Sequence, residues 1–185
     1  TPTNDRNTPP NSTVDNPPPV TVCRRVYRRI SACDETSVRV LRQSFTNFEG
    51  LMITDGDPRD AGRSERHYGD QGIRIIKTTA RLGLSGSRNA GLREARSELI
   101  AFIDSDDWCE PDRLATQVAF LGRHPDHVLV GGALRFVNEM SEIIGSRSYP
   151  QNDDEIKRTI VIYNCIAKPT SMARPRSMNE AGEGR

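Results

Sequence analysis

The sequence has no apolar run long enough to cross a lipid bilayer and no recognisable signal peptide. It also has no excess of charge of one sign, because 26 Lys and Arg are balanced by 25 Asp and Glu, a formal net charge of +1. This balance argues against nucleic acid as a partner held by an overall positive field. We therefore expect a cytoplasmic protein, with peripheral attachment to the inner face of a membrane as the alternative.

Cysteine is scarce and is not arranged for a structural role. The four cysteines are Cys23, Cys33, Cys109 and Cys165, and no two of them have C-x-x-C spacing. No histidine accompanies them at the spacing of a zinc site. Free thiols in a reducing compartment are therefore expected, without a disulfide framework or a zinc centre.

Residues 1–19 contain almost no side chain that could contribute to a core. The segment is rich in Pro, Asn and Thr and ends in three consecutive prolines. Such a composition cannot offset the entropy cost of ordering. The sequence predicts a disordered lead-in over 1–19 and one folded domain over 20–185.

From Val20 onward, strand-like and helix-like segments alternate. A continuous apolar run such as 99–103 is typical of a central parallel strand that is covered on both faces. Repeated strand–helix–strand units predict an α/β fold of Rossmann type, with a mostly parallel central sheet and helices on both faces. Strands are expected at 20–27, 51–53, 73–76, 99–103 and 128–130.

Three helices are expected from the spacing of apolar residues and from helix-start signals. In the first, Val38, Leu41 and Phe45 would share one apolar face. The second would be capped by Ser85, with Leu92 and Ala95 facing inward, and the third would start near Pro111, with Leu114, Val118 and Leu121 on one stripe.

Acidic residues follow two of the predicted strands. Asp55 comes after the second strand, in a turn that contains Gly56 and Pro58, and Asp104 follows the most apolar strand. Ligands of open α/β sheets bind beyond the carboxyl ends of the strands. We therefore expect the carboxylates of Asp55 and Asp104 to meet at one edge of the sheet.

Asp104, Asp106 and Asp107 are close enough in sequence to repel one another. A hard divalent cation, Mn²⁺ or Mg²⁺, would relieve that repulsion through carboxylate oxygens. Two alternatives are a solvated loop with helix-capping aspartates and a phosphatase of the haloacid dehalogenase type. In that phosphatase the acidic motif lies near the start of the domain, whereas here it comes late and is followed by Trp108.

Taken together, the ordered motifs of residues 20–185 resemble the family-two glycosyltransferases of the GT-A fold. The motifs are Asn47-Phe48-Glu49, Asp55-Gly56, Leu82-Gly83-Leu84-Ser85, Arg88-Asn89-Ala90-Gly91-Leu92, Ile100-Ala101-Phe102-Ile103-Asp104-Ser105-Asp106-Asp107-Trp108, Glu110-Pro111-Asp112-Arg113-Leu114, Val130-Gly131-Gly132, Asn164-Cys165-Ile166 and Pro169-Thr170-Ser171-Met172.

The resemblance implies a site for a nucleoside-diphosphate sugar, commonly UDP-linked. Asp55 would accept a hydrogen bond from the base, and Tyr27 would flank that base. Arg88, in the first turn of a helix, would help to hold the nucleotide. Asp104 would contact the ribose or the metal, and Asp106 would bind the metal, which acts as a Lewis acid on the departing diphosphate.

The reaction that the resemblance implies is a single displacement with inversion, onto the hydroxyl of a saccharide, lipid or protein acceptor. A carboxylate must then take the proton of that hydroxyl. In the family this base lies downstream of the Pro169-Thr170-Ser171-Met172 motif, so the chain is expected to end before it. Glu180 and Glu183 fit surface positions better, and no catalytic base is assigned.

The first strand departs from the family pattern at Arg24, Arg25 and Arg28, where apolar residues, a proline and an asparagine are usual. Alternation places Arg24 on the same face as Val22 and Val26, where an unpaired charge would cost several kcal/mol. Two readings stay open for these arginines: extra phosphate binding, or drift in a nonfunctional gene.

Three further positions differ from the family pattern. Thr54 replaces the first of two adjacent acids, and Arg81 and Lys168 replace residues that are commonly Asn and His. Lys168 lies in the region expected to face the acceptor, so the sequence leaves acceptor specificity open.

Three functions compete on this evidence. The first is an active glycosyltransferase, and the second is a degenerate or truncated module that binds a nucleotide sugar without transferring it. The third is a nucleotidyltransferase, which would normally carry a glycine-rich loop after its first strand. The stretch 24–29 has arginines but no glycine, and this argues against the third function.

Overall fold

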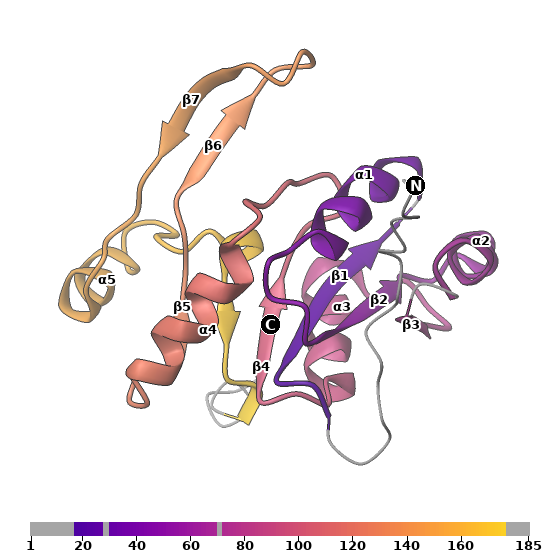
Figure 1. The fold of residues 1–185 in the computed structure, drawn as a ribbon, viewed down its shortest axis with the longest axis horizontal. Helices are drawn as coiled ribbons and strands as arrows, with labels where there is room; N and C mark the ends of the chain where they lie inside the picture. The colour runs from indigo at the N-terminus through magenta and orange to yellow at the C-terminus, as the bar shows by residue number, and fades with distance from the viewer. Residues whose placement is uncertain (1–16, 28–29, 70–71, 177–185) are drawn as a thin grey trace, which may run out of the picture.

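The computed structural model describes residues 17–27, 30–69 and 72–176. Its centre is a six-stranded sheet in the order β3-β2-β1-β4-β8-β5 (Figure 1). The strands are β1 (Val20–Val26), β2 (Phe48–Thr54), β3 (Ile73–Lys77), β4 (Leu99–Phe102), β5 (Leu129–Val130) and β8 (Met172–Ala173).

Parallel pairing dominates this sheet, as the sequence predicts. β1 pairs in parallel with both β2 and β4, and β2 pairs in parallel with β3. β8 is antiparallel to both β4 and β5. All four residues of β4 are buried, which fits a continuous apolar strand covered on both faces.

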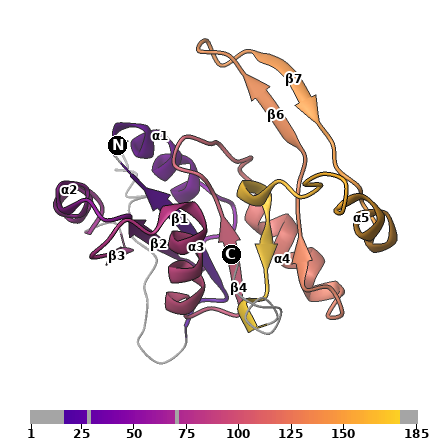
Figure 2. The ribbon, with the colours of Figure 1, turned by 180° about the vertical axis from the view of Figure 1, so that it is seen from behind.

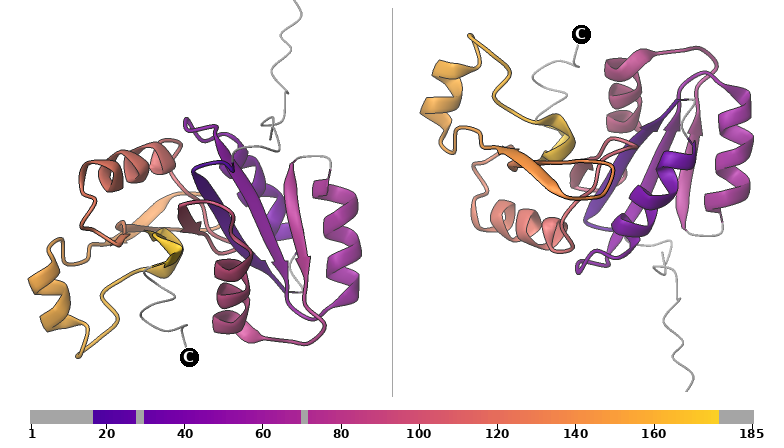
Figure 3. Two further views of the ribbon diagram at one scale, coloured as in Figure 1. Left: turned by 90° about the horizontal axis from the view of Figure 1, so that it is seen from below. Right: turned by 90° about the horizontal axis from the view of Figure 1, so that it is seen from above.

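Helices cover both faces of the sheet (Figure 3). Val40 of α1 and Leu114 and Leu121 of α4 pack with Val20 and Val22 of β1 on one face. On the same face, Tyr68 of α2 packs with Val26 and Met52, whereas Ala90 and Leu92 of α3 pack on the opposite face. The helices are α1 (Ile30–Leu41), α2 (Pro58–Tyr68), α3 (Gly83–Glu94), α4 (Arg113–Arg123) and α5 (Asp153–Thr159).

The apolar face expected for the first helix is not the face that packs on the sheet. Val38 and Leu41 are 44% and 38% exposed, and Phe45 lies beyond the end of α1. The inward residues of α1 include Thr36, Ser37 and Val40. An apolar periodicity could not reveal this face, because α1 turns polar side chains towards the interior.

A β-hairpin extends away from the sheet and was not predicted (Figures 1 and 2). It consists of β6 (Leu134–Val137) and β7 (Ile143–Arg147), which pair antiparallel. The chain then passes through α5 and a short 3₁₀ helix (Lys168–Thr170) before it returns as β8. The hairpin and the segment after α5 carry exposed apolar side chains, among them Met140, Ile144, Val161 and Ile162.

Within the described ranges, no helix combines the length and the apolar character needed to span a bilayer. The predicted lead-in lies largely outside the described residues, as do Arg28, Glu180 and Glu183. Among the described side chains, Cys23, Cys109 and Cys165 are free thiols, in agreement with the sequence.

Gly91 allows α3 to approach β1 closely, because a Cβ at this position would collide with Sγ of the buried Cys23. We predict that Gly91→Ala lowers the free energy of unfolding by about 1–3 kcal/mol through overpacking. Denaturant unfolding would measure the loss. The same change should cost clearly less in a Cys23→Ala background, and strictly additive effects of the two substitutions would contradict this packing.

Candidate functional site

The carboxyl ends of β2, β1 and β4 form one edge of the sheet. Asp55 directly follows β2, Tyr27 directly follows β1, and Asp104 lies two residues beyond the end of β4. Because these three strands are neighbours and run in parallel, the structure places all three residues at the same edge. The same edge also receives the start of α3.

Asp55 is completely buried and is held by donors from two other segments. The Arg25 guanidinium donates to Oδ2 through Nε at 2.9 Å and lies 2.7 Å from it through Nη2. The backbone N–H of Leu82 donates to Oδ1 at 2.5 Å, and that of Gly83 donates to Oδ2 at 3.1 Å. The carboxylate therefore accepts hydrogen bonds from N–H groups at the start of α3 that have no partner within the helix. The helix dipole also favours a negative charge at this position.

The predicted cap of this helix is therefore wrong. α3 begins at Gly83, and its N-cap residue, Leu82, makes no side-chain capping bond. The distant carboxylate of Asp55 takes the place that we assigned to Ser85. Gly56 brings the two segments together: its φ is +77°, and a Cβ there would lie 2.5 Å from the backbone N of Arg81.

Arg88 lies in the second turn of α3 rather than the first, which corrects the sequence prediction. Its Nη2 donates to Oδ1 of Asp104 at 3.0 Å. One helix thus contacts both strand-end carboxylates, Asp55 through its first N–H groups and Asp104 through a side chain.

The acidic loop after β4 is also fixed from the side of α1. The Thr36 hydroxyl contacts the carbonyl oxygens of Ser105 at 2.9 Å and Asp107 at 3.0 Å. Gln43, just beyond α1, donates to the carbonyl oxygen of Glu110 at 2.7 Å. We did not identify Thr36 or Gln43 as site residues, because neither belongs to the motifs around the acids.

Charge repulsion in the acidic loop is visible at Asp107. Its burial raises the pKa of this carboxyl above the ordinary value, and the neighbouring Asp104 and Asp106 raise it further. Asp106 itself is exposed. Carboxylate oxygens in such a loop have the chemistry that Mg²⁺ and Mn²⁺ prefer.

The acidic loop does not form a complete cage for a cation. Within 17–27, 30–69 and 72–176, the potential metal ligands that do cluster lie elsewhere, at the far end of α4. They are His124, Asp126 and His127, and one ligand atom of each lies within 4.8 Å of the other two. A cation at Asp104 and Asp106 would therefore need further oxygens from water or from phosphates.

Arginine side chains surround Tyr27, which is partly buried. The guanidinium carbon of Arg81 lies 4.4 Å from the centre of the tyrosine ring, and that of Arg25 lies 5.1 Å from it. Cations over an aromatic face are attracted by its quadrupole. The edge of the sheet thus combines an aromatic ring, two buried or partly buried carboxylates and three arginines.

Two small cavities lie near β1, and they differ in chemistry. One of about 10 Å³ is lined by Arg25, Ser87, Arg88 and Asp104, among others, and the Ser87 hydroxyl is buried there without a hydrogen-bond partner. Cys23 also lines it, but burial raises the pKa of this thiol to about 12, so it is neutral and not nucleophilic at neutral pH. Through Arg88 and Asp104 this cavity adjoins the candidate site at the edge of the sheet.

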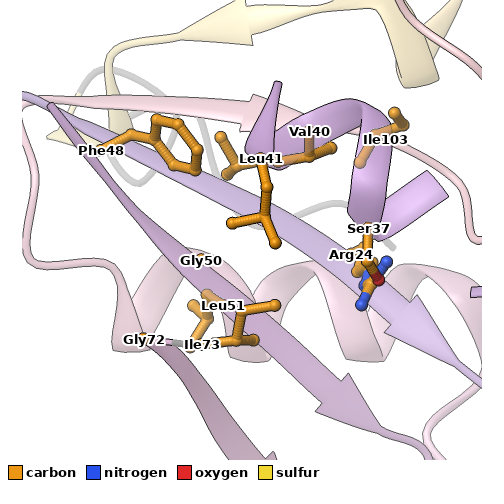
Figure 4. A pocket seen from close by; sticks show the side chains of 11 residues that line it. Arg24, Ser37, Val40, Leu41, Phe48, Gly50, Leu51, Gly72, Ile73 and Ile103 are labelled. Carbon is orange, nitrogen blue, oxygen red and sulfur yellow. The ribbon is translucent and has the colours of Figure 1, made fainter. Parts of the chain in front are cut away.

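The other cavity, of about 20 Å³, lies between α1 and the sheet and is mostly apolar (Figure 4). Arg24 reaches it from the face predicted by alternation, and its guanidinium carbon lies 5.0 Å from the ring centre of Tyr68. The ring of Tyr68 therefore partly compensates the buried charge. Because neither Asp55 nor the acidic loop lines this cavity, we do not place the site there.

Comparison with known proteins finds similarity to glycosyltransferases. Residues 21–180 match the model of a family described as glycosyl transferase family 2. An O-antigen biosynthesis glycosyltransferase of Escherichia coli, WbnJ, is 30% identical over 155 residues, which cover 83% of this chain and 60% of that protein.

Two solved structures share the fold at low identity. The mannosyltransferase PcManGT of Pyrobaculum calidifontis, in complex with GDP-Man and Mn²⁺, is 17% identical with a TM-score of 0.65 and covers 98% of this chain. Residues 1–349 of S. aureus TarS, in complex with UDP-GlcNAc, are 20% identical with a TM-score of 0.69 and cover 88%. This chain spans 60% of the E. coli relative and 50% and 47% of the two solved chains.

We predict that Thr36→Val loosens the acidic loop, because the change removes a buried hydroxyl that contacts two loop carbonyls. Leaving such carbonyls without a donor costs about 1–3 kcal/mol. Denaturant unfolding would show the loss, and amide hydrogen exchange would place it in residues 104–110. Thr116→Val, at an exposed position of α4, is the matched control. Equal effects of the two changes would contradict the assigned role.

Proposed function

The chain belongs to glycosyl transferase family 2, and from this membership and the site geometry we propose that it binds a UDP-linked sugar for transfer to an acceptor hydroxyl. The observation that carries the proposal is that Asp55 and Asp104 follow β2 and β4, the two strands that flank β1 in parallel, and that both residues contact α3. A nucleotide laid across this edge can reach both carboxylates. Ligands of open α/β sheets bind at such edges.

Each residue at the edge has chemistry suited to one part of the donor. Asp55 offers acceptor oxygens to an N–H of the base, and Tyr27 would flank that base with the guanidinium groups of Arg25 and Arg81 over its ring. Arg88 carries a positive charge for the diphosphate. Support for a nucleotide sugar also comes from the fold relatives, whose structures contain UDP-GlcNAc and GDP-Man.

Asp104 and Asp106 would hold a divalent cation, Mn²⁺ or Mg²⁺. When bound, the cation would offset the charge that develops on the leaving diphosphate. Burial raises the pKa of Asp107 most, and repulsion from Asp104 and Asp106 raises it further; a cation would relieve that repulsion, and PcManGT was solved with Mn²⁺. The two aspartates leave room in the coordination shell for phosphate oxygens.

We further propose that the sugar is transferred with inversion to a saccharide, lipid or protein acceptor. Inversion in one displacement requires a carboxylate that takes the proton from the acceptor hydroxyl. None of the residues placed at the edge so far is assigned this role. Asp55 is completely buried and already accepts hydrogen bonds from Arg25, Leu82 and Gly83, so it is not proposed to reach the acceptor hydroxyl. Asp104 and Asp106 are proposed to bind the cation instead.

Asp106→Asn should weaken the binding of UDP in the presence of Mn²⁺ by at least about tenfold, because losing a charge-assisted contact costs roughly 1.5–3 kcal/mol. Titration calorimetry would measure the affinity, and a UDP-release assay with UDP-sugars would report turnover. Asp112→Asn, an exposed aspartate that follows the same loop, is the control. UDP binding that is equally tight with EDTA, or equally weakened in the control, would overturn the metal assignment.

Arg25 competes with the base for Asp55, because both guanidinium contacts fall on the carboxylate that the base must reach. Binding through Asp55 therefore requires this ion pair to open. We predict that Arg25→Met raises the affinity for UDP about tenfold while it lowers the free energy of unfolding by a few kcal/mol, because a buried carboxylate loses its partner.

Arg81→Met is the matched control for Arg25→Met, since it removes the other guanidinium over Tyr27 and leaves the ion pair at Asp55 in place. Its affinity for UDP should not rise. If Arg25→Met instead binds UDP more weakly than the unmodified chain, Arg25 is a ligand of the nucleotide and not a competitor for Asp55.

A further inference from the structure

Two of the three histidines of the chain meet at the end of α4, in the turn that leads to β5. The ring centres of His124 and His127 lie 5.1 Å apart, and Nδ1 of His127 lies 3.1 Å from Oδ1 of Asp126. One ligand atom from each of the three residues lies within 4.8 Å of the other two. The side chains of Asp126 and His127 are 79% and 43% exposed, so an ion from solution can reach them.

The backbone of this turn is held in place from several sides. The N–H of His127 donates to the carbonyl oxygen of His124 at 3.0 Å. Arg174, which follows β8, donates through Nε to the carbonyl oxygen of His127 at 3.2 Å and through Nη2 to that of Leu121 at 3.0 Å. The backbone that carries the three side chains is therefore fixed by hydrogen bonds from within the turn and from Arg174.

Phe120 orients both imidazoles. Its ring centre lies 4.5 Å from that of His124 and 5.4 Å from that of His127. Metal-binding histidines need their rings held in a fixed orientation, and packing against a neighbouring ring does this without using a ring nitrogen. Each histidine thus keeps a nitrogen with which it can bind an ion.

Two imidazoles and one carboxylate form a ligand set for a borderline divalent cation rather than for Mg²⁺ or Ca²⁺. We propose that His124, Asp126 and His127 bind Zn²⁺ in a site with three protein ligands and one position open to water or to a ligand from another molecule. The three ligand atoms already lie within 4.8 Å of one another. Small side-chain rotations would therefore let all three reach one Zn²⁺ at bond lengths of about 2.0–2.2 Å.

This site is separate from the acidic loop. α4 starts at Arg113, next to that loop, and runs 11 residues back towards the opposite edge of the sheet (Figure 1). At about 1.5 Å per residue, the two ends of the helix are roughly 16 Å apart. A cation at the histidines therefore does not replace the one proposed at Asp104 and Asp106, and the proposal does not depend on the proposed function.

The test uses the full chain, stripped with a chelator and titrated with Zn²⁺ in the presence of excess Mg²⁺. One tight site per chain is expected. His124→Gln should weaken it at least about tenfold, the size of effect seen when a metal site loses supporting contacts. Asp126→Asn, which is nearly isosteric, should weaken it in the same direction and keeps the test valid if His124→Gln perturbs the turn.

His67→Gln is the matched control, because His67 is the remaining histidine and lies exposed on α2. It should bind Zn²⁺ like the unmodified chain. Titration with Co²⁺ adds a spectroscopic test, since a site without cysteine gives no thiolate-to-cobalt charge-transfer band. The proposal is overturned if the unmodified chain fails to bind Zn²⁺, if His67→Gln loses as much affinity as His124→Gln, or if a thiolate band appears.

Discussion

The carboxylate of Asp55 has no exposed surface, although it lies at the edge of the sheet where a ligand would arrive. Its charge is stabilised by the first N–H groups of α3 and by the guanidinium of Arg25 on β1. An uncompensated charge at this depth would be costly. The end of β2, the end of β1 and the start of α3 must therefore assemble together, and the close approach at Gly56 permits this.

α3 sets the spacing between the two halves of the site. Its first N–H groups hold Asp55, and one turn later Arg88 holds Asp104. The helix can lie close to β1 because Gly91 has no side chain above Cys23. In this arrangement each strand-end carboxylate is paired with one arginine. Arg25 would have to leave Asp55 before a base could bind there, whereas Arg88 holds Asp104 beside the position proposed for the diphosphate. The affinity of the proposed site for a nucleotide therefore depends on the strength of the ion pair between Arg25 and Asp55.

The main parallel strands, and the location of Asp55 and Asp104 at one edge, could be predicted, because apolar runs mark buried strands and parallel strands end on the same side. The inward face of α1 and the position of Gln43 just beyond it could not be predicted, since Thr36 and Gln43 are polar residues that contact the acidic loop and the segment after it. Ser85 fitted a local capping rule, but the capping role belongs to Asp55, a residue 27 positions from Leu82. The ion pair between Arg25 and Asp55 could not be predicted either, because strand alternation assigns a side chain to one face of the sheet but does not identify its partner. Short elements such as β8, with two residues, give too little periodicity to be seen.

Titrating UDP, with Mg²⁺ present, into the ¹⁵N-labelled chain and following backbone amide signals by NMR tests the account most directly. If one nucleotide bridges the edge, the amides of Leu82 and Gly83 and those of residues 104–107 should shift together along one binding curve. Shifts confined to one of these segments, or centred on the apolar cavity beside Val40 and Ile73, would contradict it.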